Sequence, residues 1–240
     1  SSMKRVVLVT GTDTGVGKTT ISVALLGAWA RRGWRVRPYK PIETGLCERS
    51  VDSDASRLAL AVGLQEPQTA YLRFKMPVAP EAAAAAEGKR IDVDRLVEAC
   101  RALPGDCILI EGAGGLLVPI APGFVVADLA LALGARLLLV GRTQLGTINH
   151  TLLTLAEARR RGLLVCGVIL NRLRADIGPE ESDTLRLIAS HGGITPLGPF
   201  PWSEQQDVDT LATLAARHLP IEALFDQAFD TKQSAGDGLE

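Results

Sequence analysis

The sequence predicts an α/β fold, with one domain built on a doubly wound, mostly parallel sheet that carries helices on both faces. Short aliphatic segments without polar alternation recur along the chain, and such segments are typical of strands buried on both faces. Longer segments with helical periodicity separate them and are long enough to serve as crossover helices. Together these two observations favour a single alternating β/α unit over separate domains.

Five short segments are expected to be strands, and all of them except Val36–Tyr39 are almost wholly aliphatic. Their ranges are Val6–Thr10, Val36–Tyr39, Cys107–Ile110, Leu137–Val140 and Leu164–Leu170. Seven segments have apolar residues at helical spacing. These expected helices are Lys18–Arg32, Asp54–Val62, Val93–Leu103, Val126–Leu133, Thr147–Arg161, Glu180–His191 and Asp207–His218. The proline-containing stretch 65–89 is expected to be irregular, with a short helix in its alanine run, 82–86.

Composition and charge narrow the class of protein. The 240 residues are 47% hydrophobic and 22% charged, with a net charge of −1, so no overall field draws the protein to nucleic acid or to a membrane. No apolar run approaches the length of a membrane span, and we expect a cytoplasmic protein. We assign residues 1–228 to the domain and expect the polar residues 229–240 to form a mobile tail.

The four cysteines and three histidines do not suggest a metal site or a disulfide framework. No two cysteines form a CxxC pair, and the histidines are scattered along the chain. We therefore expect the cysteines to be thiols in or near the core.

A phosphate-binding loop follows the first expected strand. The stretch GTDTGVGKTT fits the pattern G-x-x-x-x-G-K-[ST] with Gly11, Gly17, Lys18 and Thr19. Its glycines allow backbone N–H groups to point inward, and the helix that follows adds positive potential at its N-terminus. Lys18 can reach the outer phosphates, and Thr19 supplies a hydroxyl for Mg²⁺. The fold expected is therefore of the P-loop NTPase type.

Two more charged residues follow strands of the same sheet. Lys40 ends the second strand, in YKPIETG, and Glu111 ends the third, in LIEGAGG. Ligands collect beyond the carboxyl ends of parallel strands, so Glu111 is a candidate Mg²⁺ ligand, with a turn-capping glutamate as the alternative. From position alone, Lys40 could equally be a solvated lysine. Asp52 or Asp54 could cap the next helix, which is the commoner use of such a residue.

A second helix start has free backbone N–H groups. The stretch LGTINH, residues 145–150, lies between a strand and a helix and forms a potential anion site. We expect His150 within it to have a structural role.

The ordered set of motifs resembles dethiobiotin synthetase from about Val6 to Trp202. The set comprises GTDTGVGKT, YKPIETG, DSDA, IEGAGG, LGTINH, ILNR and FPW. Members of that family are homodimers with a P-loop α/β fold. They use ATP and Mg²⁺ to close a ureido ring on 7,8-diaminononanoate with CO₂, in biotin biosynthesis.

The resemblance implies a role for each matching residue. Lys18 and the loop amides would hold the triphosphate, Lys40 would be the catalytic lysine beside it, and Thr19, Asp54 and Glu111 would bind Mg²⁺. The substrate would contact Thr44 and, in the partner subunit, Gly146 and Asn149. The nucleotide-binding residues implied are Thr12, Asp13, Thr14, Gly15, Val16, Gly17, Lys18, Thr19, Asp54, Glu111, Gly112, Ala113, Gly114, Asn171 and Pro201.

The chain departs from the family pattern at three places. Gly15 stands where other members carry larger residues, and Gln144 stands where some carry lysine. Glu43 brings a carboxylate near a substrate that has one of its own, and if it pointed into the pocket it would repel that substrate.

Two other classes of P-loop protein are alternatives. Partitioning or cell-division ATPases share the fold, but they carry a lysine five residues before the P-loop lysine, where this chain has Asp13. A corrinoid amidotransferase would need a glutaminase domain, for which the chain has no room.

Overall fold

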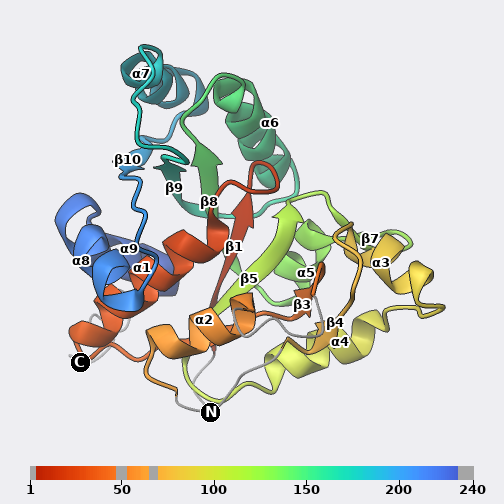
Figure 1. The fold of residues 1–240 in the computed structure, drawn as a ribbon. Helices are drawn as coiled ribbons and strands as arrows, with labels where there is room; N and C mark the ends of the chain where they lie inside the picture. Colours follow the sequence, from red (N-terminus) through yellow and green to blue (C-terminus); the bar gives the residue numbers. More distant parts are fainter. Residues whose placement is uncertain (1–3, 47–52, 65–69, 232–240) are drawn as a thin grey trace, which may run out of the picture.

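The computed structural model describes residues 4–46, 53–64 and 70–231. Its centre is a sheet of six parallel strands in the order β10-β9-β8-β1-β5-β2 (Figure 1). The strands are β1 (Arg5–Gly11), β2 (Arg37–Tyr39), β5 (Cys107–Gly115), β8 (Arg136–Arg142), β9 (Val165–Asn171) and β10 (Leu197–Phe200). The five expected strands are all present, and β10 adds an edge that the sequence analysis did not predict.

The described residues contain nine α-helices. They are α1 (Lys18–Arg31), α2 (Asp54–Ala61), α3 (Pro80–Ala86), α4 (Val93–Arg101), α5 (Val126–Ala132), α6 (Thr147–Arg160), α7 (Glu181–Gly192), α8 (Val208–His218) and α9 (Ile221–Phe229). The seven expected helices match to within about two residues at their ends. The short helix α3 begins at Pro80, where proline suits the first turn of a helix, and α9 was not expected.

Helices cover both faces of the sheet, as the doubly wound prediction requires. Along β1, Val7 and Val9 join one core with residues of α1, α2, α8 and α9. Leu8, which points to the opposite face, joins a second core with residues of α3 to α7. The alternation of side chains along a strand thus divides one aliphatic segment between two cores.

The last described helix, α9, closes the core beside α1. The indole of Trp29 lies 5.6 Å from the ring of Phe225 and 5.8 Å from that of Phe229, centroid to centroid, both in edge-on geometry. Its Nε1 donates a hydrogen bond of 2.8 Å to the Ile221 carbonyl. Phe229 is fully buried and is part of the fold rather than of a tail, and residues 232–240 of the expected tail lie outside the described residues.

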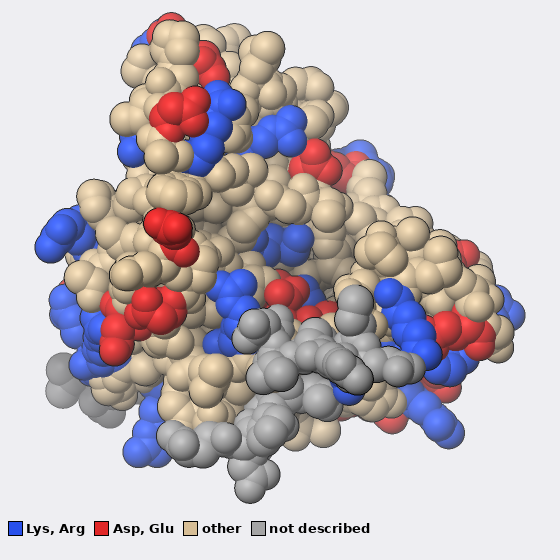
Figure 2. All heavy atoms as spheres, viewed as in Figure 1, with Lys and Arg blue, Asp and Glu red and all other residues tan. Residues whose placement is uncertain are grey.

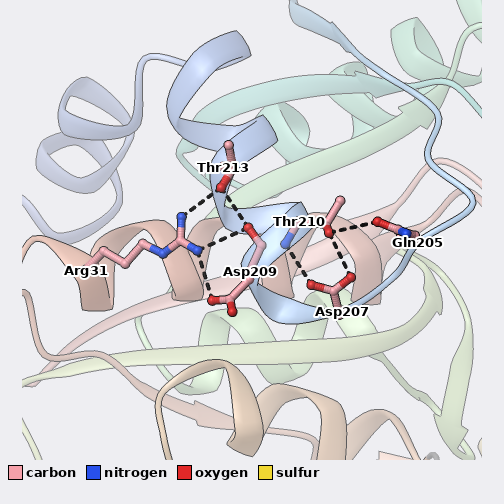
Figure 3. A network of polar contacts seen from close by, with 6 residues as sticks. All are labelled: Arg31, Gln205, Asp207, Asp209, Thr210 and Thr213. Atoms are coloured by element: carbon pink, nitrogen blue, oxygen red, sulfur yellow. Dashed lines mark hydrogen bonds and ion pairs between the residues drawn. The ribbon is translucent and has the colours of Figure 1, made fainter.

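Polar contacts at the surface join α8 to α1 (Figure 3). The Arg31 guanidinium contacts the Asp209 carboxylate at 2.9 Å and the Thr213 hydroxyl at 2.9 Å. Asp207 caps α8 by accepting a hydrogen bond from the Thr210 amide at 2.8 Å. The contacts of Arg31 fix the end of α1 that lies away from the phosphate loop.

Two small sheets flank the main one. Strands β3 (Ile42–Glu43) and β4 (Leu72–Arg73) pair in parallel, and β6 (Pro119–Ala121) and β7 (Phe124–Val125) pair antiparallel. The pairing with β4 holds the segment that follows β2, because the Leu72 amide donates to Pro41 and the Phe74 amide donates to Glu43. This segment carries Lys40 and Thr44.

The three described cysteines lie in or near the core, as expected. Cys100 and Cys166 are buried, Cys107 is half-buried, and Cys47 lies outside the described residues. Among the helices that the structure describes, none has the length and apolar character needed to cross a membrane.

Candidate functional site

The phosphate loop links β1 to α1 in a shape that requires glycine. Gly17, the N-cap of α1, has φ +93°, and a Cβ there would lie 2.1 Å from the Asn171 Nδ2. Asn171 in turn donates to the Val16 carbonyl at 3.0 Å, and the Thr12 amide donates to Val140 at 2.9 Å. Neighbouring strands therefore hold both ends of the loop, with the N-terminus of α1 available for an anion.

The loop and the ends of neighbouring strands surround a cleft of about 370 Å³. Acidic and basic side chains lie next to one another in the hollow at the centre of this face (Figure 2). Many of the predicted site residues line the cleft. They are Thr14, Gly15, Gly17, Lys18, Thr19, Lys40, Thr44, Asp54, Glu111, Ala113 and Gly114.

Lys40 and Glu111 form the centre of the cleft. The Lys40 ammonium lies 2.8 Å from Oε1 of Glu111, 3.2 Å from the Gly112 carbonyl and 3.3 Å from Oδ2 of Asp54. The Thr19 hydroxyl donates to the same Glu111 oxygen at 2.7 Å. Lys40 is buried and is not the solvated surface lysine that its position alone allowed.

The pKa values of Lys18 and Lys40 are shifted in opposite directions. Burial lowers the pKa of Lys18, and the nearby Lys40 ammonium lowers it further, against the attraction of Glu111, Asp54 and Asp13. Burial also disfavours the charged form of Lys40, but Glu111 and Asp54 outweigh it and raise the pKa of Lys40. Lys40 is therefore fixed as a cation.

The chemistry of the site suits a divalent cation. The described residues contain no group of three or more His, Cys, Asp or Glu that could hold a metal, so the ligands within these ranges do not form a closed site by themselves. However, Oε2 of Glu111 is buried and has no hydrogen-bond partner. This oxygen, the Thr19 hydroxyl and the half-exposed Asp54 carboxylate are hard oxygen donors, which fits Mg²⁺ bound by one or two carboxylates and substrate phosphates.

The start of α2 differs from the expectation. Its N-cap is Ser53, whose hydroxyl accepts from the Ser56 amide at 3.2 Å. Asp54 is the first helical residue, and Asp52 lies outside the described residues. Neither aspartate is therefore assigned the capping role.

Glu43 is directed at the backbone of α2. Its Oε1 accepts from the Asp54 amide at 2.6 Å, and its Oε2 lies 3.5 Å from the Ala55 amide. Burial raises the pKa of Glu43, against the hydrogen bond from the Asp54 amide. The carboxylate is thus occupied by amides, although Glu43 does border the cleft.

A second, smaller hollow of about 150 Å³ adjoins the loop. Asn171 and Pro201, two of the nucleotide-binding residues that the resemblance implies, both line it with Gly17, Thr20 and Trp202. The cis peptide between Gly198 and Pro199 in β10 lies just before this region.

Gly146 and Asn149 do not line the cleft of their own chain. Gly146 caps α6 with φ +98°, and Asn149 is exposed in its first turn. The Gln144 side-chain oxygen is buried without a hydrogen-bond partner.

The structure adds charged residues that the sequence analysis missed. Arg142, at the end of β8, forms an ion pair of 3.2 Å with Asp13 in the loop, and Arg57 of α2 lines the cleft. Arg142 ends a strand of the same sheet, so the reasoning applied to Lys40 and Glu111 could have found it. Arg57 lies inside a helix, and the sequence gives no comparable signal for it.

The fold and the loop define a P-loop nucleotide-binding protein. Residues 5–210 match the model of a family described as an AAA domain. Among curated proteins, the ATP-dependent dethiobiotin synthetase of Anaeromyxobacter dehalogenans (strain 2CP-C) is 44% identical over 206 residues, covering 82% of this chain and 90% of the relative. The ATP-dependent dethiobiotin synthetase of Marinobacter nauticus is 35% identical over 232 residues, covering 93% of this chain and 99% of the relative. The chain belongs to the family of ATP-dependent dethiobiotin synthetases.

Solved structures share the fold at low identity. The septum site-determining protein MinD from Pyrococcus horikoshii, solved with Mg-ADP, has a TM-score of 0.57 and 19% identity, with 98% of each chain covered. A ParA family ATPase from Chlorobium tepidum has a TM-score of 0.54 and 16% identity, with 95% of this chain and 98% of that chain covered. These likenesses show the fold alone.

Proposed function

We propose that the chain closes the ureido ring of dethiobiotin, using ATP, CO₂ and 7,8-diaminononanoate and releasing ADP and phosphate. Membership of the synthetase family supports this reaction. The observation that carries it is the shared Glu111 oxygen, which accepts from Thr19 of the phosphate loop and from Lys40 of the neighbouring segment. Thr19, on the phosphate-binding side of the cleft, and Lys40, on the proposed substrate side, thus meet at the same Glu111 oxygen.

The phosphate side of the proposal rests on the loop. Lys18 and the amides of residues 12–19 hold the triphosphate, with the N-terminus of α1 supplying positive potential. Thr19, Asp54 and Glu111 hold Mg²⁺, which when bound neutralises charge on the phosphate oxygens. The hollow between Gly17 and Pro201 receives the adenine.

The substrate side rests on the segment from Lys40 to Thr44. One amine of the substrate adds to CO₂ and loses a proton, giving a carbamate. A carbamate oxygen then attacks the γ-phosphorus and ADP leaves, which gives a carbamic-phosphoric mixed anhydride. The second amine attacks the carbonyl carbon and loses a proton, and phosphate leaves as the five-membered ring closes. Lys40 stabilises the negative charge that gathers in these steps, and no protein nucleophile is needed.

The proposed enzyme is a cytoplasmic homodimer with two composite sites. Gly146 and Asn149 do not border their own chain's cleft, which suits a role in the partner's site. The amides at the start of α6 would receive the substrate carboxylate there.

Phosphate release tests the reaction. We expect ATP hydrolysis only when diamine and bicarbonate are both present, with one phosphate released per dethiobiotin formed. Hydrolysis when the diamine or bicarbonate is left out would instead indicate an ATPase of the partitioning or cell-division type. Lys18→Ala should lose nucleotide binding, whereas Lys89→Ala, at a lysine paired with Glu87 on the surface, should match the parent.

Refolded mixtures test the composite site. We expect Lys18→Ala and Asn149→Asp each to be inactive, the second because its carboxylate repels that of the substrate. Refolded together, they form heterodimers with one intact site and one doubly altered site. Random pairing should then restore about a quarter of the parent activity, and no recovery in demonstrated heterodimers would mean that each chain forms its site alone.

A further inference from the structure

We infer that Glu43 is a positioning residue, which holds Asp54 in the site by tying the first turn of α2 to the segment that carries Lys40 and Thr44. The inference rests on the proposed function, because it concerns the placement of a proposed Mg²⁺ ligand. Glu43 itself is not assigned a contact with metal or substrate.

The contacts of Glu43 are with the backbone of the residue it positions. Oε1 accepts from the Asp54 amide at 2.6 Å, and Oε2 faces the Ala55 amide at 3.5 Å. The residue is 6% exposed, so water competes little for these amides. Ser53 serves a different amide, that of Ser56, and the two side chains therefore hold different parts of the turn.

Glu43 can position Asp54 because its own backbone is fixed. Glu43 pairs with Arg73 in the small parallel sheet of β3 and β4. Its carbonyl accepts from the amide of Phe74 at 3.0 Å, and the Phe74 side chain is buried. A displacement of Glu43 would thus require β3 to move away from β4.

The placement of Asp54 matters because α2, through Asp54, and β5, through Glu111, both contact Lys40. The Asp54 carboxylate lies 3.3 Å from the Lys40 ammonium, which also contacts Glu111. The link through Glu43 joins the α2 backbone directly to the strand that follows Lys40. Asp54 thereby stays near Lys40 and Glu111 whatever its own side chain is binding.

The electrostatics argue for a specific role rather than a general cap. The negative charge of the Glu43 carboxylate repels that of Asp54, so having both carboxylates at the start of α2 carries an electrostatic cost. The N-terminus of α2 offsets that repulsion, because its amides stabilise negative charge. Ser53 already caps the helix at no such cost, so the benefit of Glu43 is best explained by the fixed position of Asp54.

Four variants test the inference: Glu43→Ala, Glu43→Gln, Ser53→Ala and Asp54→Asn. One readout is the Mg²⁺ concentration that half-saturates binding of a non-hydrolysable ATP analogue, measured by calorimetry. Loss of a residue that orients a metal ligand typically weakens metal binding 10- to 100-fold. We expect Glu43→Ala to raise the half-saturating Mg²⁺ concentration at least about tenfold. Glu43→Gln should show much less of this rise, because its side-chain amide oxygen can still accept a hydrogen bond from the Asp54 backbone amide. Ser53→Ala should keep the half-saturating concentration of the parent.

Hydrogen exchange of the ligand-free protein gives a second readout. Glu43→Ala should remove protection from the Asp54 and Ala55 amides, and Ser53→Ala should remove it from Ser56. Unchanged protection at Asp54 in Glu43→Ala would overturn the inference, and so would an equal shift in Mg²⁺ dependence in Ser53→Ala. If Asp54→Asn left the Mg²⁺ dependence unchanged, the proposed metal assignment would fail, and hydrogen exchange would still decide whether Glu43 positions Asp54.

Discussion

Replacing Lys40 with methionine should destabilise the fold as well as stop the reaction. The ammonium contacts Glu111 at 2.8 Å, with side chains 6% and 1% exposed respectively. Removing one partner of a buried ion pair leaves an uncompensated charge and costs about 3–5 kcal/mol. For a chain of this size, 1 kcal/mol shifts the melting temperature by about 2–4 °C, so we expect Lys40→Met to lower it by about 6–20 °C.

A double-mutant cycle separates the ion pair from the loss of packing. Urea denaturation without nucleotide or Mg²⁺ would compare Lys40→Met, Glu111→Gln and the double variant. The free energy of unfolding that the double variant loses should be smaller, by about 1–3 kcal/mol, than the sum of the losses in the two single variants. Strict additivity would refute the reasoning. As a control, Arg31→Met breaks an ion pair whose side chains are 45% and 92% exposed, and it should cost below about 1 kcal/mol.

Three further predictions concern the loop, the core and the thiols. Gly17→Ala should abolish tight ATP binding, because its Cβ would meet Asn171 at a positive φ; calorimetric binding at parental affinity would contradict this. Trp29→Phe should cost about 1–3 kcal/mol in urea denaturation, because the carbonyl of the buried Ile221 loses its hydrogen bond from the indole, and an unchanged midpoint would argue otherwise. Burial raises the pKa of both Cys100 and Cys166 to about 12, so at pH 8 they should resist iodoacetamide until the protein is unfolded; mass spectrometry that finds either one alkylated in the folded protein would count against it.

Strands β1, β5, β8 and β9 could be predicted because each contains an aliphatic run that is buried in the sheet, whereas β2, with the sequence RPY, is a partly buried edge strand. Strand β10 was missed because Gly198 and Pro199 interrupt its pattern, and both residues are rare inside strands. Strands β3 and β4 have two residues each, too short for any periodicity. Helix α9 was missed because it has nine residues and begins directly after Pro220, so it offers few repeats of the helical period.

The part of the candidate site that could be predicted from the sequence is the part formed by residues at the carboxyl ends of parallel strands. Lys40 and Glu111 meet because β2 and β5 are neighbours. The direction of the Glu43 side chain could not be predicted in this way. It depends on where the start of α2 lies relative to β3, and that position is set by tertiary packing rather than by local sequence.

The packing of α9 on α1 has a consequence for how the chain reaches its folded state. The Trp29 indole bonds to a carbonyl 192 residues later in the chain, and its aromatic neighbours also come from α9. During synthesis the face of α1 that packs on α8 and α9 therefore stays uncovered until almost all of the described chain has been made. Such long-range closure slows folding and leaves intermediates with exposed apolar surface, so the newly made protein should depend on chaperones most at this stage.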